Sequence, residues 1–165
     1  MDWHSYFMHL AEQVALKSKD SSTKLGAIVV GPDHEIRATG YNSFPRGIND
    51  DVPERQVRPE KYKYFEHSER NAFYNAARHG ASLNGCTLYC AWLPCTDCAR
   101  GIIQVGISKL VVKSFQIPER WVVDMVTSVT MLKEAGVEIQ LFDKPHPAHW
   151  DIILQELNGK KTKEN

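Results

Sequence analysis

Residues 86–114 read CTLYCAWLPCTDCARGIIQVGISKLVVKS, and this stretch decides the predicted fold. Polar and apolar side chains alternate over residues 86–93, which predicts a strand, and residues 94–106 predict a helix that begins at Pro94. Apolar residues return at 109–114 and predict a second strand. Two strands joined by a helix form a parallel crossover, so the chain should build an α/β sheet with helices packed on its faces.

The flanking sequence extends this unit in both directions. Residues 24–42 contain two apolar runs joined by GPDH, and they predict an antiparallel hairpin. The remaining pattern predicts helices over residues 3–18, 67–79 and 119–135 and a strand over 137–142. The first helix should have Asp2 as its N-cap and bury one apolar face, formed by Trp3, Phe7, Leu10 and Val14 and extended by Leu16.

Length and composition favour one domain. The 165 residues and 42% hydrophobic content suffice for a single core, which we assign to residues 1–157, followed by a solvated tail at 158–165. Basic and acidic residues balance at 20 each, which argues against a long nucleic acid as partner. No apolar run reaches the ~18 residues of a membrane helix, and the start of the chain lacks a leader pattern. A cytoplasmic protein without membrane attachment is therefore expected.

Residues 43–65 form a long segment with three prolines, many charges and no clear period. A loop of this length within a compact domain is usually functional or disordered. Its aromatic residues Tyr62, Tyr64 and Phe65 argue against full disorder. Two interpretations are open for them: packing beneath the loop, or a platform on which a base stacks.

The cysteines point to a metal. All four lie within residues 86–98, which would be a poor disulfide framework for a domain of this length. Cys95 and Cys98, in PCTDC, lie one turn apart at a predicted helix start, where the positive end of the helix favours thiolates. With His67 they make a soft N/S set that suits Zn²⁺, and three protein ligands leave a fourth position for water, as in catalytic sites.

The histidine motif, EHSERN at 66–71, supplies two carboxylates. Glu69 is two residues from His67, about 200° around an ideal helix, so it should lie beside the ion and not on it. There it would take a proton from the activated water and deliver it to a ring nitrogen and a leaving amine. For Glu66 a catalytic role stays open. The simpler interpretation is that its negative charge interacts favourably with the positive N-terminal end of the helix.

H-x-E followed by P-C-x-x-C is the zinc nucleobase deaminase signature. By chance P-C-x-x-C should occur about 0.005 times in this composition, against about 0.5 for H-x-E, so the cysteine motif carries the assignment. Four segments extend the match: SKDSSTKLGAIVV (18–30), GYNSFPRG (40–47), HSERNA (67–72) and TLYCAWLPCTDCARGIIQVGISKLVV (87–112). They resemble, in order, motifs of the deoxycytidylate (dCMP) deaminase family within the cytidine deaminase superfamily.

The resemblance covers roughly residues 1–142 and implies both fold and reaction. The fold is a three-layer α/β/α arrangement, similar to cytidine deaminase, with a five-stranded mixed sheet and flanking helices. The reaction is zinc-dependent hydrolytic deamination of a pyrimidine deoxynucleotide, dCMP to dUMP with release of ammonia. Partners would be the small nucleotide and further copies of the chain in a homo-oligomer, assembled through the helical faces.

Site residues follow by resemblance. His67, Cys95 and Cys98 would hold Zn²⁺ and Glu69 would carry protons, while backbone amides around Ser68 and Cys95 would position the base and the nucleophile. Asn42 would bind the sugar, and Lys19 matches a basic position suited to the 5′-phosphate. Ser68 stands where relatives usually have alanine, which can change contacts to the base.

Other positions leave alternatives open. Ser43 stands where glycine is common in nucleotide-regulated relatives, so regulation by deoxynucleoside triphosphates is not implied. Arg46 and Arg58 are further phosphate candidates or solvated surface charges. Cys86 and Cys90 are predicted to be small, buried core side chains, and for Cys90 a role as metal ligand is the alternative. His146 and His149 are a possible metal pair or two turn residues.

Three functions compete. A dCMP deaminase fits the motifs, whereas a tRNA adenosine deaminase, or another nucleoside or nucleobase deaminase, would share the zinc chemistry. The balanced charge speaks against a polynucleotide substrate. A noncatalytic zinc module would need a fourth protein ligand.

Overall fold

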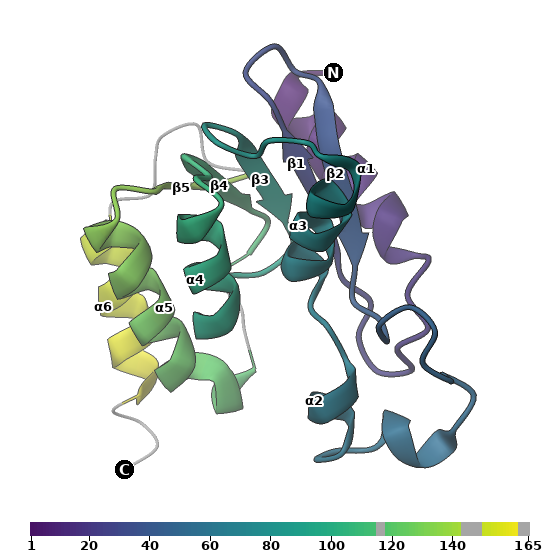
Figure 1. The fold of residues 1–165 in the computed structure, drawn as a ribbon. Coiled ribbons are helices and arrows are strands. Elements are labelled where there is room, and N and C mark those ends of the chain that lie inside the picture. The colour runs from purple at the N-terminus through teal and green to yellow at the C-terminus, as the bar shows by residue number, and fades with distance from the viewer. Residues whose placement is uncertain (115–117, 143–149, 162–165) are drawn as a thin grey trace.

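One mixed sheet organises the chain, with strand order β2-β1-β3-β4-β5 (Figure 1). The structure is a computed structural model that describes residues 1–114, 118–142 and 150–161. β1 pairs antiparallel with both β2 and β3, while β3, β4 and β5 run parallel. The strands are β1 Gly26–Val30, β2 Ile36–Tyr41, β3 Thr87–Cys90, β4 Lys109–Val112 and β5 Glu138–Leu141. The predicted hairpin and the predicted parallel crossover are both confirmed.

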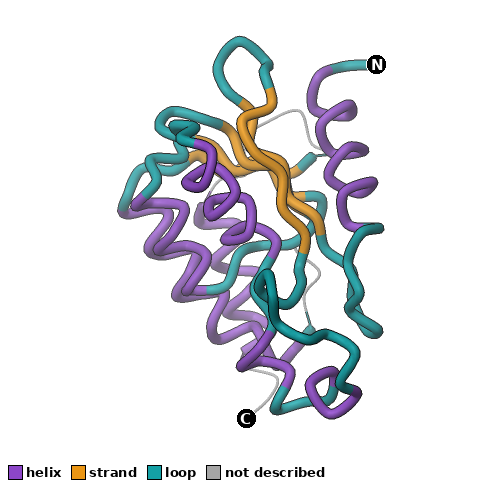
Figure 2. Tube along the Cα trace, turned by 45° about the vertical axis from the view of Figure 1, so that its right-hand side comes forward, coloured by secondary structure: helices purple, strands orange, loops and turns teal. Residues whose placement is uncertain are grey.

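Helices cover both faces of this sheet. Figure 1 shows α3 and α4 in front of the strands, and in the turned view of Figure 2 α1 stands on the other side. The helices are α1 Trp3–Ala15, α2 Lys61–Tyr64, α3 Ser68–His79, α4 Thr96–Gln104, α5 Val122–Glu134 and α6 Trp150–Lys161, with 3₁₀ turns Pro53–Gln56 and Glu119–Trp121. None of the helices in the described part of the chain is long and apolar enough to cross a membrane.

Strand β1 shows why two helical layers form. Its residues alternate between faces. Ala27 and Val29 pack in the core that includes α3, α4, α5 and α6, whereas Ile28 and Val30 pack with Phe7 of α1. A strand that is apolar on both sides needs cover on both sides, so the predicted three-layer α/β/α fold is confirmed.

Helix α1 differs from its prediction in length and in its buried face. Asp2 is the N-cap and accepts a hydrogen bond from Ser5 N at 2.9 Å, but the helix ends at Ala15 instead of residue 18. The buried residues are Phe7, Met8, Ala11 and Ala15, and the predicted Leu10 and Val14 pack, partly buried, against the same core. Trp3 and Leu16, by contrast, are 52% and 65% exposed. The reason is close approach to the sheet: a Cβ at Gly26 would lie 2.0 Å from Ala11 O, so small residues face the strand.

The two helices that carry the predicted ligands begin at those ligands. His67 is the N-cap of α3, and Gly80 ends that helix in the left-handed conformation at φ 70°, as predicted. Helix α4 begins later than predicted, at Thr96 with Cys95 as N-cap, so Pro94 precedes the helix. Helix α5 supplies the reason: Asp124 accepts hydrogen bonds from Thr96 N and Oγ1, and holds the chain extended before the first turn.

The segment 43–65 is ordered around two short helical turns and an aromatic contact. Phe44 is buried, and its ring lies 4.5 Å from that of Phe65 and 6.0 Å from that of Tyr64, measured between centroids. The packing interpretation therefore holds for Tyr64, whereas Phe65 both packs on Phe44 and lines a cleft. Tyr62 is 45% exposed and faces a cleft.

At the C-terminal end, α6 continues to Lys161, past residue 157 where the sequence indicated the end of the domain. Ile153 and Leu157 are buried, whereas residues 158 and 159 are exposed and add only polar or small side chains to the helix. His146 and His149 lie outside the described residues.

Candidate functional site

Three predicted metal ligands converge where α3 and α4 begin. His67 Nδ1 lies 3.4 Å from Cys95 Sγ and 3.6 Å from Cys98 Sγ, and all three ligand atoms lie within 4.8 Å of one another. Cys95 is the N-cap of α4 and Cys98 the third residue of its first turn, positions whose side chains face each other. Both sulfurs thus lie at the positive end of α4, which favours the thiolate form.

The spacing of these atoms fits zinc. With Zn–N of about 2.0 Å, Zn–S of about 2.3 Å and tetrahedral angles, an N···S edge should measure about 3.5 Å. The two observed distances are 3.4 and 3.6 Å. Among the described residues, this is the group of three or more His, Cys, Asp or Glu side chains close enough to share an ion.

The three side chains of the group shift one another's pKa values. The hydrogen bond with Cys98 lowers the pKa of Cys95 to about 3, with help from His67 and against the effect of burial. The same bond and burial raise the pKa of Cys98. Burial by itself lowers the pKa of His67, but Cys95 and Glu69 outweigh it and raise that pKa. A cation that binds here displaces these protons.

Arg70 lies beside the two thiols, a position that was not predicted from the sequence. Its Nη1 lies 3.6 Å from Cys98 Sγ and 4.0 Å from Cys95 Sγ, and it pairs with Glu66 one turn earlier. Glu66 also accepts a hydrogen bond from His67 N, which suits a residue at a helix start. The i,i+4 spacing of Glu66 and Arg70 was the available signal.

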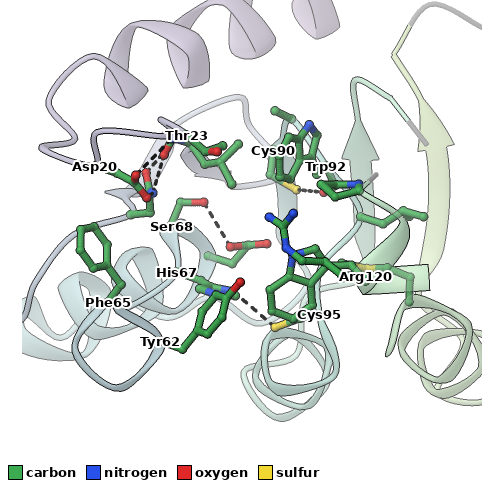
Figure 3. A pocket seen from close by; sticks show the side chains of 18 of the residues that line it. Asp20, Thr23, Tyr62, Phe65, His67, Ser68, Cys90, Trp92, Cys95 and Arg120 are labelled. Atoms are coloured by element: carbon green, nitrogen blue, oxygen red, sulfur yellow. Dashed lines mark hydrogen bonds between the residues drawn. The ribbon is translucent and has the colours of Figure 1, made fainter. Parts of the chain in front are cut away.

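A cleft that is partly open to solvent lies against this group (Figure 3). Glu69 lines it and is 7% exposed, and Ser68 Oγ donates a hydrogen bond to Glu69 Oε2 at 3.1 Å. The lining combines segments far apart in the chain: Asp20, Thr23, Leu25, Asn42, Arg58, Lys61, Tyr62, Phe65, His67, Ser68, Glu69, Cys90, Ala91, Trp92, Leu93, Cys95, Pro118, Arg120, Trp121 and Met125. His67, Ser68, Glu69, Cys95 and Asn42 are therefore brought together as the sequence predicted.

Cys90 lines the cleft without joining the metal group. Its thiol donates a hydrogen bond to Trp92 O at 3.1 Å, and burial raises its pKa. Cys86 is also buried, and neither cysteine is among the three residues that could share an ion. Both behave as small core side chains.

The predicted cations divide between the cleft and the surface. Lys19 is 63% exposed and pairs with Asp50, outside the cleft lining, so its phosphate role stays a prediction. Arg46 donates to Asn75 in a separate depression. Arg58 lines the cleft together with Arg120, which was not among the predicted site residues.

Arg120 has no hydrogen bond or ion pair within residues 1–114, 118–142 and 150–161, and Figure 3 shows its guanidinium over the cleft. Its neighbour Trp121 places its ring centroid 6.3 Å from that of His67 and 5.9 Å from that of Tyr62, with both pairs edge to face. Beside the metal group, the cleft thus has aromatic side chains and the charge of Arg120, which no carboxylate of the described residues neutralises.

Comparison with known proteins identifies relatives over most of the chain. The family described as "Cytidine and deoxycytidylate deaminase zinc-binding region" matches residues 1–114. A deoxycytidylate deaminase of Mus musculus is 36% identical over 160 residues, 93% of this chain and 85% of the mouse protein. The Homo sapiens deoxycytidylate deaminase is 35% identical over 148 residues, 86% of this chain and 80% of the human protein.

A solved structure agrees with the fold. The dCMP deaminase of cyanophage S-TIM5, crystallised in complex with dCMP and dUMP, superposes with a TM-score of 0.67 at 28% identity. The match covers 83% of this chain and 94% of the phage chain. The chain thus shares its overall fold with that phage structure.

Proposed function

This chain belongs to the family of zinc-binding cytidine and deoxycytidylate deaminases, and we propose that it hydrolyses dCMP to dUMP and ammonia. One observation carries the proposal. The buried carboxylate of Glu69 lines the same cleft as the His67 and Cys95 ligands, but does not belong to the ligand group. A structural zinc site needs no such carboxylate, whereas a hydrolytic deaminase needs a proton carrier there.

The chain's own residues supply the proton steps. Zinc held by the ligand group provides Lewis-acid activation of water. Glu69 accepts a proton from the attacking water and delivers it to ring N3 as the bond to C4 forms. Glu69 then takes the remaining proton from the new C4 hydroxyl and passes it to the amine, so that the C4–O double bond forms as the C4–N bond breaks and ammonia leaves. The hydrogen bond from Ser68 holds one carboxylate oxygen in place during both transfers.

The cleft also accommodates the rest of a nucleotide. Trp121, Tyr62 and Phe65 give apolar ring surface for the base and sugar. Arg58 and Arg120 are the cations of the lining without a carboxylate partner in the described part of the chain, and we assign the 5′-phosphate to them. Lys61, by contrast, forms a buried salt bridge with Asp20.

Ammonia release from a substrate panel tests the proposal. The panel contains dCMP, dCTP, deoxycytidine, CMP, dAMP and tRNA, and dCMP should give the highest kcat/KM. Turnover of tRNA alone would refute the assignment.

The proton role needs a separate test. Glu69→Gln should retain zinc and lose turnover, whereas the control Glu134→Gln, at an exposed position of α5, should be as active as the unaltered protein. Full activity of Glu69→Gln would contradict the proton role.

Two further predictions go with this function. We expect the chain to assemble into a homo-oligomer, and light scattering would measure its mass in solution. Residence in the cytoplasm is supported by four unpaired cysteine thiols, which suit a reducing compartment. Localisation of a tagged chain in cells tests that prediction.

A further inference from the structure

Cys95 is a metal ligand that lies just outside helix α4, and the helix holds only one side of it. Ala99 N donates to Cys95 O at 2.8 Å, a backbone bond of the first turn. Cys95 itself is extended, with φ −68° and ψ 172°. Cys98, by contrast, lies within α4, where helical hydrogen bonds fix its backbone. The direction of the Cys95 sulfur therefore depends on contacts from outside α4.

Helix α5, which lies beside α4 in Figure 1, supplies these contacts. Asp124 and Ser128 are four residues apart and so share one face of α5. Asp124 accepts from Thr96 N at 2.8 Å and from Thr96 Oγ1 at 2.7 Å. Ser128 Oγ donates to Pro94 O at 2.5 Å. The two side chains thus hold the residues immediately before and after Cys95.

Because peptide units are planar, these bonds restrain the ligand itself. Pro94 O belongs to the peptide unit before Cys95, and Thr96 N belongs to the unit after it. The two planes meet at the Cα atom of Cys95, so their orientations set φ and ψ of this residue and the direction of its Cα–Cβ bond. Only rotation about χ1, among three staggered positions, then remains to place Sγ.

Helix α5 can hold the turn in place because it is anchored in the core. Val122, Val129 and Leu132 are fully buried, and Ser128 is 0% exposed. A hydroxyl in such a place costs free energy unless it is hydrogen-bonded, and the bond to Pro94 O offsets that cost. Alanine would fill the same position without this requirement. Packing alone therefore does not explain the hydroxyl.

We infer that Asp124 and Ser128 are positioning residues of the metal centre. They hold the backbone of Cys95 so that its sulfur faces His67 Nδ1 at 3.4 Å, the separation that a shared zinc ion needs. Neither residue belongs to the group of ligands, so both act through Cys95. This inference rests on the zinc binding that the proposed function also uses, and it is independent of the substrate.

Metal affinity tests the inference without any turnover. Asp124→Ala and Ser128→Ala should each weaken Zn²⁺ binding about 10–100-fold in competition with a metal indicator. With Co²⁺ in place of Zn²⁺, the thiolate-to-metal charge-transfer band should shift or weaken, because Cys95 then meets the ion at a different angle. Thr127→Ala is the matched control, since it removes from the same helix a hydroxyl that bonds to Val123 O within that helix. Its affinity and cobalt spectrum should equal those of the unaltered chain.

The conservative variant Asp124→Asn separates hydrogen bonding from charge. Its Oδ1 can accept from Thr96 N while its Nδ2 donates to Thr96 Oγ1, because a hydroxyl both donates and accepts. It should therefore restore the cobalt spectrum and bind Zn²⁺ within about threefold of the unaltered chain, the small loss expected from a missing charge at the N-terminus of α4. An Asp124→Asn protein that resembles Asp124→Ala in both measurements would refute positioning by hydrogen bonds.

The outcomes separate this inference from the proposed function. Unaltered Zn²⁺ affinity and an unaltered cobalt spectrum in both alanine variants would overturn the inference and leave the deamination standing. An unaltered chain that binds zinc but does not deaminate dCMP would overturn the function and leave the inference standing. Should an alanine variant fail to fold, Thr96→Val removes one bond to Asp124 and should change the same spectrum to a smaller extent. No change in that variant would count against the inference in the same way.

Discussion

Replacement of Gly40 by alanine should damage catalysis from a position outside the cleft lining. Gly40 lies in β2 beneath α3, the helix that begins at His67 and carries Glu69. A Cβ at this position would lie 2.3 Å from both Ser68 O and Ala72 N, whereas ordinary contact begins at 3.4 Å. Both obstacles are backbone atoms of the helix, so no side-chain rotation relieves the contact.

The size of the effect follows from that overlap. The difference between 3.4 and 2.3 Å requires α3 to retreat from β2 by about 1 Å. A displacement of about 1 Å in a reacting group costs roughly 100-fold in rate, because proton transfer depends on alignment. Overpacking of this kind costs about 1–3 kcal/mol of unfolding free energy. For a domain of this size, that lowers the melting temperature by roughly 2–12 °C.

Three measurements on Gly40→Ala check the argument: kcat for dCMP, bound zinc and the melting temperature. Gly159→Ala is the control, because a Cβ at that position of α6 has no neighbour within 4 Å. The control should keep kcat and gain up to about 1 kcal/mol of helix stability. A Gly40→Ala protein with unchanged kcat and melting temperature would show that α3 does not depend on this close approach.

Other predictions concern the metal and the buried charge. Arg70→Leu should weaken zinc binding about 10–100-fold, measured by competition with a metal indicator, since a guanidinium 3.6 Å from Cys98 Sγ favours the thiolate; unchanged affinity would exclude that role. Chelation should abolish deamination and added Zn²⁺ should restore it, and less chelator should suffice at lower pH because protons compete for the ligands. Burial would raise the pKa of Asp20, but hydrogen bonds from Lys61 and Ser22 lower it below 3.8, so its stabilisation is complete above that pH and is lost as pH falls through the folded-state pKa. Urea unfolding across the acid range should show this loss, and Asp20→Asn should lack it.

The sequence predicted the pair of cysteines because their geometry is local. Cys95 and Cys98 face each other through the N-cap and first turn of one helix, a relation that their spacing alone determines. His67 lies 28 residues from Cys95, and it was added because H-x-E followed by P-C-x-x-C matches the zinc deaminase signature. The hairpin and the parallel crossover were predictable for the same reason, since turn residues and apolar periodicity act within a few residues.

Only the tertiary structure decided what surrounds that group. Lys61 meets Asp20 across 41 residues, and Asp124 holds Thr96 across 28, distances over which no periodic pattern relates one residue to another. These contacts hold Asp20 in the cleft lining and place the start of α4 after Pro94. The sequence by itself determined which two sulfurs could share a metal, because Cys95 and Cys98 lie at one helix end. The structure decided which side chains line the cleft beside them, because packing of distant segments buries and orients those side chains.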